Sequence, residues 1–240
     1  MTSERDGAGN YDWSVFMAQS AVKYRRAATS GDITGLEHHN LVTGIDQEIL
    51  FMQALCRRWP GPGARALDVC CGGGFLAEGL VRAGFDVSAF DLDENAILYA
   101  RRRFPGINFL SGNALTPREI GVHGRFDLIV MREVHPLTRV GDFDFNWRFV
   151  QTYLDMLTDK GALVIAHAPP PDGPSVDMGR LRSACETKGF RFRGPYYYPL
   201  YKRLGRGSRN AAVIILLSWA AGLMNIFLRR RWIRYVVIGR

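Results

Sequence analysis

The amino-acid sequence predicts a doubly wound α/β sheet, and three observations carry that prediction. Short apolar segments alternate with helical ones between residues 66 and 188. The first apolar segment runs into three consecutive glycines, Gly72 to Gly74, and the second is followed by an acid, Asp91. Alternating strands and helices build a mostly parallel sheet with helices on both faces. A strand, a glycine turn, a helix, a strand and an acid in this order are the layout of a nucleotide site.

The elements follow one another along a single predicted domain of 240 residues. A polar tail (1–10), expected to be disordered and without signal-peptide character, precedes helical segments at 11–30 and 45–58. The expected strands are 66–70, 85–90, 107–110, 126–131 and 162–167, and the expected helices are 75–83, 93–103, 145–157 and 177–188. Two more strands, 190–198 and 232–239, enclose an uncharged segment, 211–228. The chain is therefore divided into a tail and helical cap (1–44), a core (45–198), an insertion (199–230) and a last strand (231–240).

The glycine turn distinguishes between two kinds of nucleotide ligand. A dinucleotide fold requires Gly-x-Gly-x-x-Gly, whereas here adjacent glycines follow Leu67-Asp68-Val69-Cys70-Cys71. This segment resembles Leu-Asp-x-Gly-x-Gly-x-Gly, the first motif of class I S-adenosylmethionine-dependent methyltransferases, with Cys70 in place of the first glycine. Four segments resemble the later motifs in the right order: Phe90–Asp93 (FDLD), Gly112–Ala114 (GNA), Phe126–Val130 (FDLIV) and Leu157–Ile165 (LTDKGALVI). The resemblance covers roughly residues 45–170 and implies a seven-stranded sheet whose last strand is antiparallel.

The resemblance also implies a cofactor, S-adenosylmethionine, which leaves as S-adenosylhomocysteine. The loop 70–74 would hold its amino-acid part, Asp91 its ribose hydroxyls, and Leu92 would lie against the adenine. Asn113 stands where an Asp is usual, but its amide oxygen still accepts a hydrogen bond. The residues assigned to the cofactor are Asp68, Cys70, Gly72, Gly74, Asp91, Leu92, Asn113, Ala114 and Arg132.

Candidate catalytic residues follow the fourth expected strand. Ligands of a doubly wound sheet bind at the carboxyl ends of its strands, so Arg132, Glu133 and His135 are expected beside the transferred methyl. His135 is predicted to be a general base, since an imidazole pKa near 6.5 suits that role at neutral pH. The alternative is a histidine that only hydrogen-bonds a loop carbonyl. His167 ends the fifth strand and is expected to face the same cleft.

Other sequence features narrow the chemistry. The segment after the fourth strand is not Asn/Asp-Pro-Pro-Tyr and carries no catalytic-cysteine motif, which disfavours methylation of adenine amino groups and of pyrimidine C5. No His, Cys and acid set has metal-ligand spacing. Four scattered cysteines favour a reduced, cytoplasmic chain. His38 and His39 lie in a region expected to cover the cofactor.

Basic charge is concentrated in the C-terminal quarter. Residues 180–240 hold 14 of the 31 Lys and Arg side chains and one of the 23 acids. Such a region suits nucleic acid or an anionic membrane. The arginines bracket the apolar segment and do not interleave a polar face, so nucleic acid is disfavoured. These arginines are Arg203, Arg206, Arg209, Arg229, Arg230 and Arg231.

The apolar segment 211–228 has three interpretations. It is short for a membrane-spanning helix. It either packs on the domain, over the active site or at a dimer interface, or dips into an anionic membrane through residues 203–231. The expected function is methyl transfer to an O or N atom of a small or lipid-like acceptor, with peripheral membrane binding. A nucleic-acid methyltransferase and a non-catalytic cofactor-binding protein are the alternatives.

Overall fold

The computed structural model describes residues 14–30, 41–56, 58–168, 174–198, 202, 204, 210–228 and 232–240. Within them the chain forms one seven-stranded sheet with the order β3-β2-β1-β4-β5-β7-β6. The strands are β1 (Arg65–Val69), β2 (Asp86–Asp91), β3 (Asn108–Ser111), β4 (Phe126–Arg132), β5 (Leu157–His167), β6 (Arg191–Tyr197) and β7 (Arg234–Gly239). The first five pair in parallel, and β7 is antiparallel to both β5 and β6. The predicted doubly wound sheet with an antiparallel last strand is confirmed.

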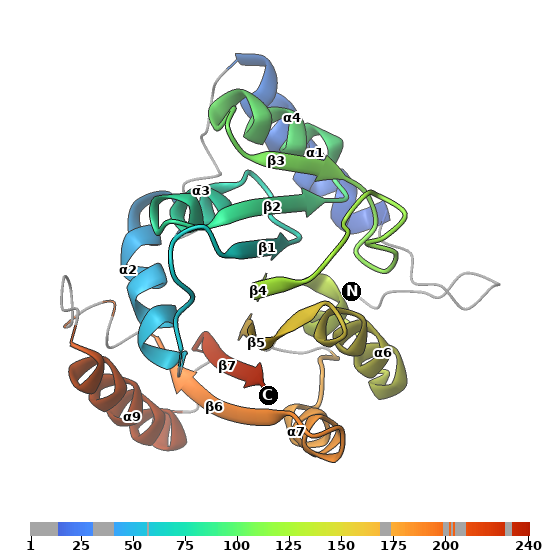
Figure 1. The fold of residues 1–240 in the computed structure, drawn as a ribbon. Helices are drawn as coiled ribbons and strands as arrows, with labels where there is room; N and C mark the ends of the chain where they lie inside the picture. Colours follow the sequence, from blue (N-terminus) through green and yellow to red (C-terminus); the bar gives the residue numbers. More distant parts are fainter. Residues whose placement is uncertain are drawn as a thin grey trace.

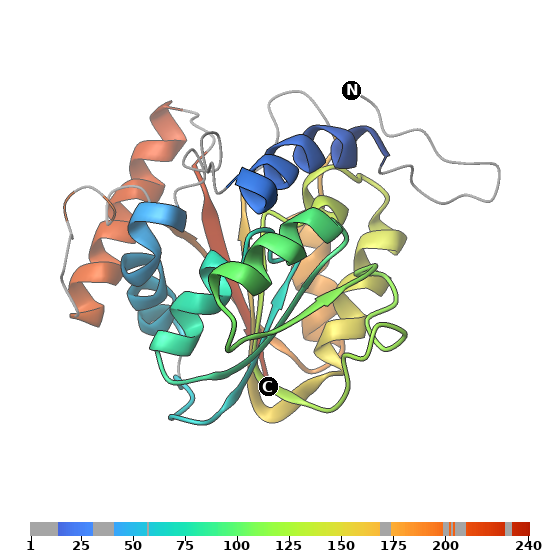
Figure 2. The same ribbon diagram turned by 90° about the horizontal axis from the view of Figure 1, so that it is seen from above.

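Helices cover both faces of this sheet (Figure 1). The helices are α1 (Ser14–Ser30), α2 (Leu41–Leu55), α3 (Phe75–Arg82), α4 (Glu94–Arg103), α5 (His135–Thr138), α6 (Phe143–Leu154), α7 (Met178–Thr187) and α9 (Ala211–Leu228). One face carries α2, α3, α4 and α9, and the other carries α5, α6 and α7. Helix α1 packs on α4 at one end of the sheet, and the C-terminus lies at the other end (Figure 2). The predicted helical cap and the helical insertion between β6 and β7 are both present.

The two-sided burial explains why the strands are continuously apolar. Val164 and Ala166 of β5 belong to the core cluster beneath α2 and α3, whereas Leu163 and Ile165 belong to the cluster beneath α6 and α7. Successive side chains of a strand point to opposite faces. A parallel sheet covered on both faces therefore requires apolar residues at nearly every position.

Some predicted boundaries differ from the structure. Helix α2 begins at Leu41, four residues earlier than expected. Strand β5 begins at Leu157, because that residue already pairs with Phe126 across an irregularity that precedes the regular ladder. Helix α6 therefore ends at Leu154. The short α5 was not predicted; it has a proline in its first turn, where a missing N–H costs nothing.

The N-terminal cap of α3 differs from those of the other helices that follow a strand. Asp93, Asp142 and Asp177 cap α4, α6 and α7, and each side chain accepts backbone N–H groups of the first turn. Helix α3 begins instead after Gly74, which holds a left-handed conformation (φ 78°) and supplies no side-chain cap. The polar contact of the first turn of α3 comes instead from Asp68 of β1, whose carboxyl group lies against the Ala77 amide.

Several expectations lie outside the described residues. These include the tail 1–10, His38 and His39, and the arginines on both sides of α9. The division of the chain into tail, cap, core, insertion and last strand stays a prediction.

Candidate functional site

The predicted site lies at the carboxyl ends of the central strands, between β1 and β4. Cys70 follows β1 with φ 58°, and Glu133 follows β4 with φ 55°. A left-handed conformation is uncommon for residues other than glycine and is concentrated at functional positions. Cys70 thus keeps the backbone conformation that the glycine of the motif adopts freely.

Asp91 holds the glycine loop against the end of β2. Its Oδ2 accepts the Gly72 N–H at 2.8 Å, and its Oδ1 accepts the Asp93 N–H at 2.9 Å. Each carboxylate oxygen has a further lone pair for a ligand hydroxyl. Burial raises the pKa of Asp91 above its ordinary value, and the two backbone donors act in the opposite direction.

The glycines of the loop leave no room for side chains. A Cβ at Gly74 would lie 2.6 Å from the ring of Phe109, and one at Gly72 would lie 2.5 Å from the hydroxyl of Tyr24. That hydroxyl accepts the Gly73 N–H at 3.2 Å. Tyr24 belongs to α1, so the N-terminal helix closes over the glycine loop. Burial raises the pKa of Tyr24, followed by the nearby charge of Asp91.

Asp68 is the most buried acid of the loop region. It is 1% exposed, and its Oδ2 has no hydrogen-bond partner among the described residues. Burial, reinforced by Asp91, raises its pKa to about 8, against the opposing effects of the Ala77 amide and Arg132. A buried carboxyl without a partner is costly, and a cationic group bound beside it would offset that cost.

The residues assigned to the adenine lie around the end of β3. Leu92 is exposed at the end of β2, and Ala114 is buried. The Asn113 Oδ1 accepts the Leu115 N–H at 2.9 Å, so this amide stabilises its own loop and keeps one lone pair and its NH₂ for a ligand. The Ala114 carbonyl accepts the Tyr153 hydroxyl at 2.7 Å, which fixes the loop on α6.

Arg132 forms a buried ion pair rather than a free cation. Its Nε lies 2.7 Å from Oε1 of Glu48 on α2, and the Tyr235 hydroxyl of β7 donates to the same oxygen. Glu48 is 1% exposed. The pair joins α2 to the carboxyl end of β4 and, through Tyr235, to the amino end of β7. Arg132 lies close enough to Asp68 to lower the pKa of that carboxyl.

The three candidate catalytic residues share one charged neighbour, Arg139. Its positive charge lowers the pKa values of His135, His167 and Glu133. For both histidines burial is the larger cause and also lowers the pKa, whereas for Glu133 burial raises it. The Glu133 Oε1 accepts the Ala168 N–H at 2.5 Å. The structure therefore brings the predicted residues together, with Glu133 tied to the end of β5.

His167 is buried at the end of β5 beside Arg234 of β7. It is 1% exposed, and neither ring nitrogen has a hydrogen-bond partner among the described residues. Burial, followed by the charge of Arg234, lowers its pKa to about 4. The Arg234 Nε is likewise buried and without a described partner. A neutral imidazole and a guanidinium whose Nε has no described partner therefore lie on neighbouring strands.

Several residues reach the site from distant segments and were not predicted from the sequence. Tyr24 and Glu48 come from helices that precede the sheet, and Arg234 and Tyr235 come from its last strand. None belongs to a motif. A weak signal existed for Glu48, an acid among the apolar residues of an amphipathic helix.

Two further features, a metal site and a membrane-spanning helix, are absent from the described residues. Among the described residues, no group of three His, Cys, Asp or Glu side chains is placed to hold a metal ion. Within the same residues, no helix combines the length and the hydropathy needed to cross a membrane.

Parts of this chain are similar to known proteins. Residues 66–161 match the family described as methyltransferase domain. Over 111 residues the chain is 34% identical to ubiquinone biosynthesis O-methyltransferase of Sinorhizobium medicae, covering 45% of this chain and 43% of that protein. Over 133 residues it is 32% identical to ribosomal RNA small subunit methyltransferase C of Chromohalobacter salexigens, covering 54% of this chain and 40% of that protein. The chain thus spans about two-fifths of the length of these curated relatives.

A solved structure extends the likeness beyond the matched segment. Magnesium protoporphyrin IX methyltransferase from Synechocystis PCC 6803, with bound S-adenosylmethionine, superimposes with a TM-score of 0.58 at 14% identity. The match covers 95% of this chain and 94% of that chain. At this identity the likeness shows the fold, which is the methyltransferase fold expected from the motifs.

Proposed function

We propose, from the premise that residues 66–161 belong to the methyltransferase domain family, that this protein transfers a methyl group from S-adenosylmethionine to an oxygen atom of a small molecule. The observation that carries the proposal is the set of acids and glycines at the carboxyl ends of β1 and β2. Oxygen is favoured over nitrogen because the relative from Sinorhizobium medicae is an O-methyltransferase.

The residues present fit the cofactor. The buried Asp68 has an oxygen without a described partner, which suits a cationic ligand. Gly72 and Gly74 let the loop pass close to Tyr24 and Phe109, which a side chain at either position would displace. In this assignment Asp91 accepts the ribose hydroxyls with its remaining lone pairs. The other residues that would hold the cofactor are Asp68, Cys70, Gly72, Gly74, Leu92, Asn113, Ala114 and, through its pair with Glu48, Arg132.

When bound, the cofactor supplies a methyl group that its sulfonium already activates. The chain must then hold the acceptor oxygen in line with the bond between the methyl group and the sulfur, and it must remove the proton of the acceptor hydroxyl. His135 has a lowered pKa and is therefore neutral at pH 7, so it can take the proton of an acceptor hydroxyl. The charge of Arg139 would stabilise the oxyanion that remains.

His167 and Glu133 have different proposed roles. A pKa of about 4 makes His167 a weak base near neutral pH. Its two unpaired ring nitrogens, next to Arg234, suit positioning of the acceptor oxygen. Glu133 is held by the Ala168 N–H and would keep β4 and β5 in register beside the acceptor.

The test is a methyl-transfer assay with phenols and catechols that carry apolar substituents, run in parallel with ribosomal RNA. Transfer to the small acceptors is expected. His135→Ala should lower turnover by about 10²–10⁴-fold if the residue is the base. His123→Ala is the matched control, since that histidine is exposed and lies in a loop before β4. Wild-type activity should fall only at a pH below the ordinary imidazole value of 6.5, because burial and the charge of Arg139 lower the pKa of His135.

Two results would contradict this proposal. Transfer to RNA alone would favour the second relative's kind of substrate. Turnover of His135→Ala equal to that of His123→Ala would remove His135 from the reaction.

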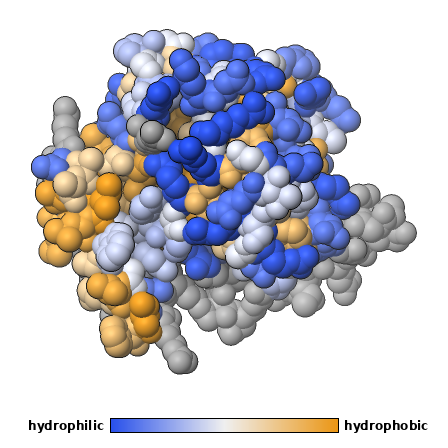
Figure 3. Space-filling view, turned by 60° about the horizontal axis from the view of Figure 1, so that its bottom comes forward, coloured by the Kyte–Doolittle hydropathy of each residue, from blue (hydrophilic) through white to orange (hydrophobic). Residues whose placement is uncertain are grey.

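The same proposal includes peripheral binding to an anionic membrane through α9. One stripe of this helix packs on the domain: Ile214, Ser218 and Ala221 are buried, and the Ser218 hydroxyl accepts the Tyr197 N–H at 2.8 Å. The opposite stripe is apolar yet exposed, as the orange surface over α9 in Figure 3 illustrates. Its members include Leu216, Trp219, Leu223, Ile226 and Phe227, and Phe227 is 83% exposed.

Charge favours a membrane as the occupant of this face. Contiguous exposed apolar patches of this kind mark interaction sites. Arginines precede and follow the helix in the sequence, with no acid after Glu186. Each arginine near an anionic surface contributes about 1 kcal/mol, and less at high salt. A lipid-like acceptor would reach the site from such a surface.

Co-sedimentation with vesicles tests this part of the proposal. The protein should bind vesicles that contain phosphatidylglycerol, and binding should weaken with salt. Trp219→Ser/Phe227→Ser should lose binding, whereas the control Val81→Ser/Leu98→Ser, which alters exposed apolar residues elsewhere, should keep it. A protein that forms dimers through Trp219 and Phe227 and ignores the vesicles would assign this face to a second copy of the chain instead.

A further inference from the structure

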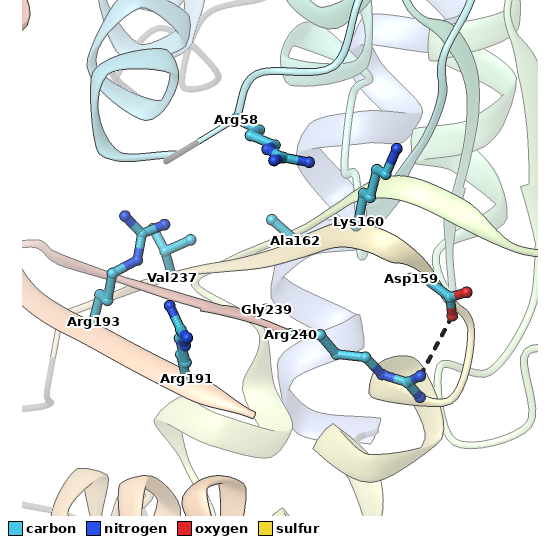
Figure 4. A pocket seen from close by; sticks show the side chains of 10 residues that line it. Arg58, Asp159, Lys160, Ala162, Arg191, Arg193, Val237, Gly239 and Arg240 are labelled. Carbon is cyan, nitrogen blue, oxygen red and sulfur yellow. Dashed lines mark hydrogen bonds and ion pairs between the residues drawn. The ribbon is translucent and has the colours of Figure 1, made fainter. Parts of the chain in front are cut away.

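A basic pocket lies at the end of the sheet that is remote from the glycine loop (Figure 4). Its volume is about 350 Å³. The charged residues that line it are five cations and one acid: Arg58, Lys160, Arg191, Arg193, Arg240 and Asp159. They come from the segment after α2, from β5 and β6, and from the residue after β7, so only the tertiary structure gathers them.

Most cations of this pocket have no counter-charge among the residues that the structure describes. The single acid, Asp159, is already shared by Arg125 at 3.5 Å and Arg240 at 3.4 Å. Four cations form no hydrogen bond or ion pair with another described residue: Arg58, Lys160, Arg191 and Arg193. Uncompensated like charges repel one another and attract anions.

The pocket also has a defined floor. Small residues form it: Gly161, Ala162, Val237 and Gly239. A Cβ at Gly239 would lie 3.1 Å from the Gly161 carbonyl oxygen, so the two strands approach closely there. Arg191 and Arg193 project from one face of β6, because Phe192 between them belongs to the core of the other face. In Figure 4 their guanidinium groups and that of Arg58 surround the space beside Ala162 and Val237.

This pocket is separate from the predicted methyl-transfer site. Ala162 pairs with Gly239 at its edge, and His167 pairs with Arg234 at the other end of the same ladder. Five residues of strand correspond to about 16 Å.

We propose that this pocket binds the diphosphate group of a soluble small molecule. The planar fork of arginine matches phosphate oxygens, and such charge-assisted hydrogen bonds are strong. The terminal phosphate of a diphosphate group carries about two negative charges and its inner phosphate about one more, so four unpaired cations are sufficient to neutralise the group. A bounded pocket suits a small ligand, whereas nucleic acid requires an extended basic stripe. The proposal does not depend on the proposed methyl transfer.

Calorimetry with inorganic pyrophosphate tests the proposal on the full chain. Pyrophosphate should bind, and Arg191→Gln/Arg193→Gln should weaken its affinity at least about tenfold through lost charge-assisted bonds. The matched control is Arg118→Gln/Arg148→Gln, which removes the same charge from exposed positions elsewhere. S-adenosylhomocysteine binding, measured on every variant, separates a folded protein with an altered pocket from a misfolded one.

The same phosphate chemistry occurs in lipid headgroups, so vesicles of phosphatidylcholine with phosphatidic acid form a second arm. If the protein binds these vesicles through Arg191 and Arg193 but does not bind pyrophosphate, the proposal of a soluble ligand is wrong. The pocket would then bind a lipid headgroup. Equal pyrophosphate affinity in the pocket variant and the control, or none in wild type, would overturn the site itself.

Discussion

The two ends of the sheet handle charge in opposite ways. At the carboxyl end two acids are tied to partners within the fold: Asp91 to two backbone N–H groups, and the buried Glu48 to Arg132 and Tyr235. At the amino end the cations Arg191 and Arg193 line an open pocket without hydrogen-bond partners among the described residues. The charged groups at the carboxyl end therefore stabilise the fold, whereas those at the amino end are available to bind a ligand.

This difference implies that the same kind of substitution has unequal costs at the two ends. Removing one partner of a buried pair leaves the other charge desolvated. Removing one cation from a partly hydrated cluster relieves repulsion instead. Unfolding free energies of matched variants at the two ends therefore test this difference.

The largest expected effect is at Glu48. Glu48→Gln would leave the Arg132 guanidinium buried without a carboxylate, and we expect a loss of about 3–5 kcal/mol in the free energy of unfolding. The control Asp46→Asn lies on the same helix and alters an exposed pair with Arg82, for which about 0–1 kcal/mol is expected. Urea unfolding of both variants is the measurement, and equal losses would show that the buried pair is not integral to the fold.

The next effect is a pH dependence caused by Asp68. Its folded pKa of about 8 exceeds the ordinary value near 3.9, so the folded protein keeps a proton that the unfolded chain releases. Stability from this group is full below about pH 4 and is lost as the pH rises through about 8. Relative to Asp68→Asn, the cofactor-free wild type should lose on the order of a few kcal/mol across this window. Parallel unfolding profiles against pH would contradict the assignment.

How far the sequence predicts this molecule depends on the distance between interacting residues. Asp68, the glycines and Asp91 lie within one strand–helix–strand unit, so local patterns revealed both the fold and the cofactor loop. Tyr24 lies 49 positions from Gly73, and Glu48 lies 187 from Tyr235. No periodicity or motif links residues so far apart, because their proximity is a product of the packed sheet.

The basic pocket and the short helix α5 were also not predicted from the sequence. The cations of the pocket are spread from Arg58 to Arg240. In the sequence, Arg191, Arg193 and Arg240 were counted only as part of the basic C-terminal quarter, and Arg58 and Lys160 lie outside that region. The single-turn α5 was missed because its four residues are too few to show a helical period. Helix α9 was located from its uncharged segment, but which stripe would be buried required the positions of β6 and α2.

A smaller effect than that of Asp68 is expected for cofactor affinity at Asp91. Asp91→Ala removes the acceptor of the Gly72 N–H and the proposed ribose contact, and should weaken S-adenosylhomocysteine binding by about 1–3 kcal/mol. Asp86→Ala, at the exposed start of the same strand, is the control and should bind as wild type. Calorimetry that shows equal affinities for the two variants would remove Asp91 from the site.

The smallest expected effect on stability is at the amino end of the sheet, in the basic pocket. Arg191→Gln removes a cation that has no hydrogen bond or ion pair with a described residue, so its stability should stay within about 0.5 kcal/mol of wild type. Any change should be a gain at low salt that disappears at high salt, because screening weakens the repulsion among the remaining cations. Thermal unfolding at several salt concentrations measures this. A loss of stability comparable to that of Glu48→Gln would mean that Arg191 belongs to the fold rather than to a ligand site, and the contrast between the two ends would fail.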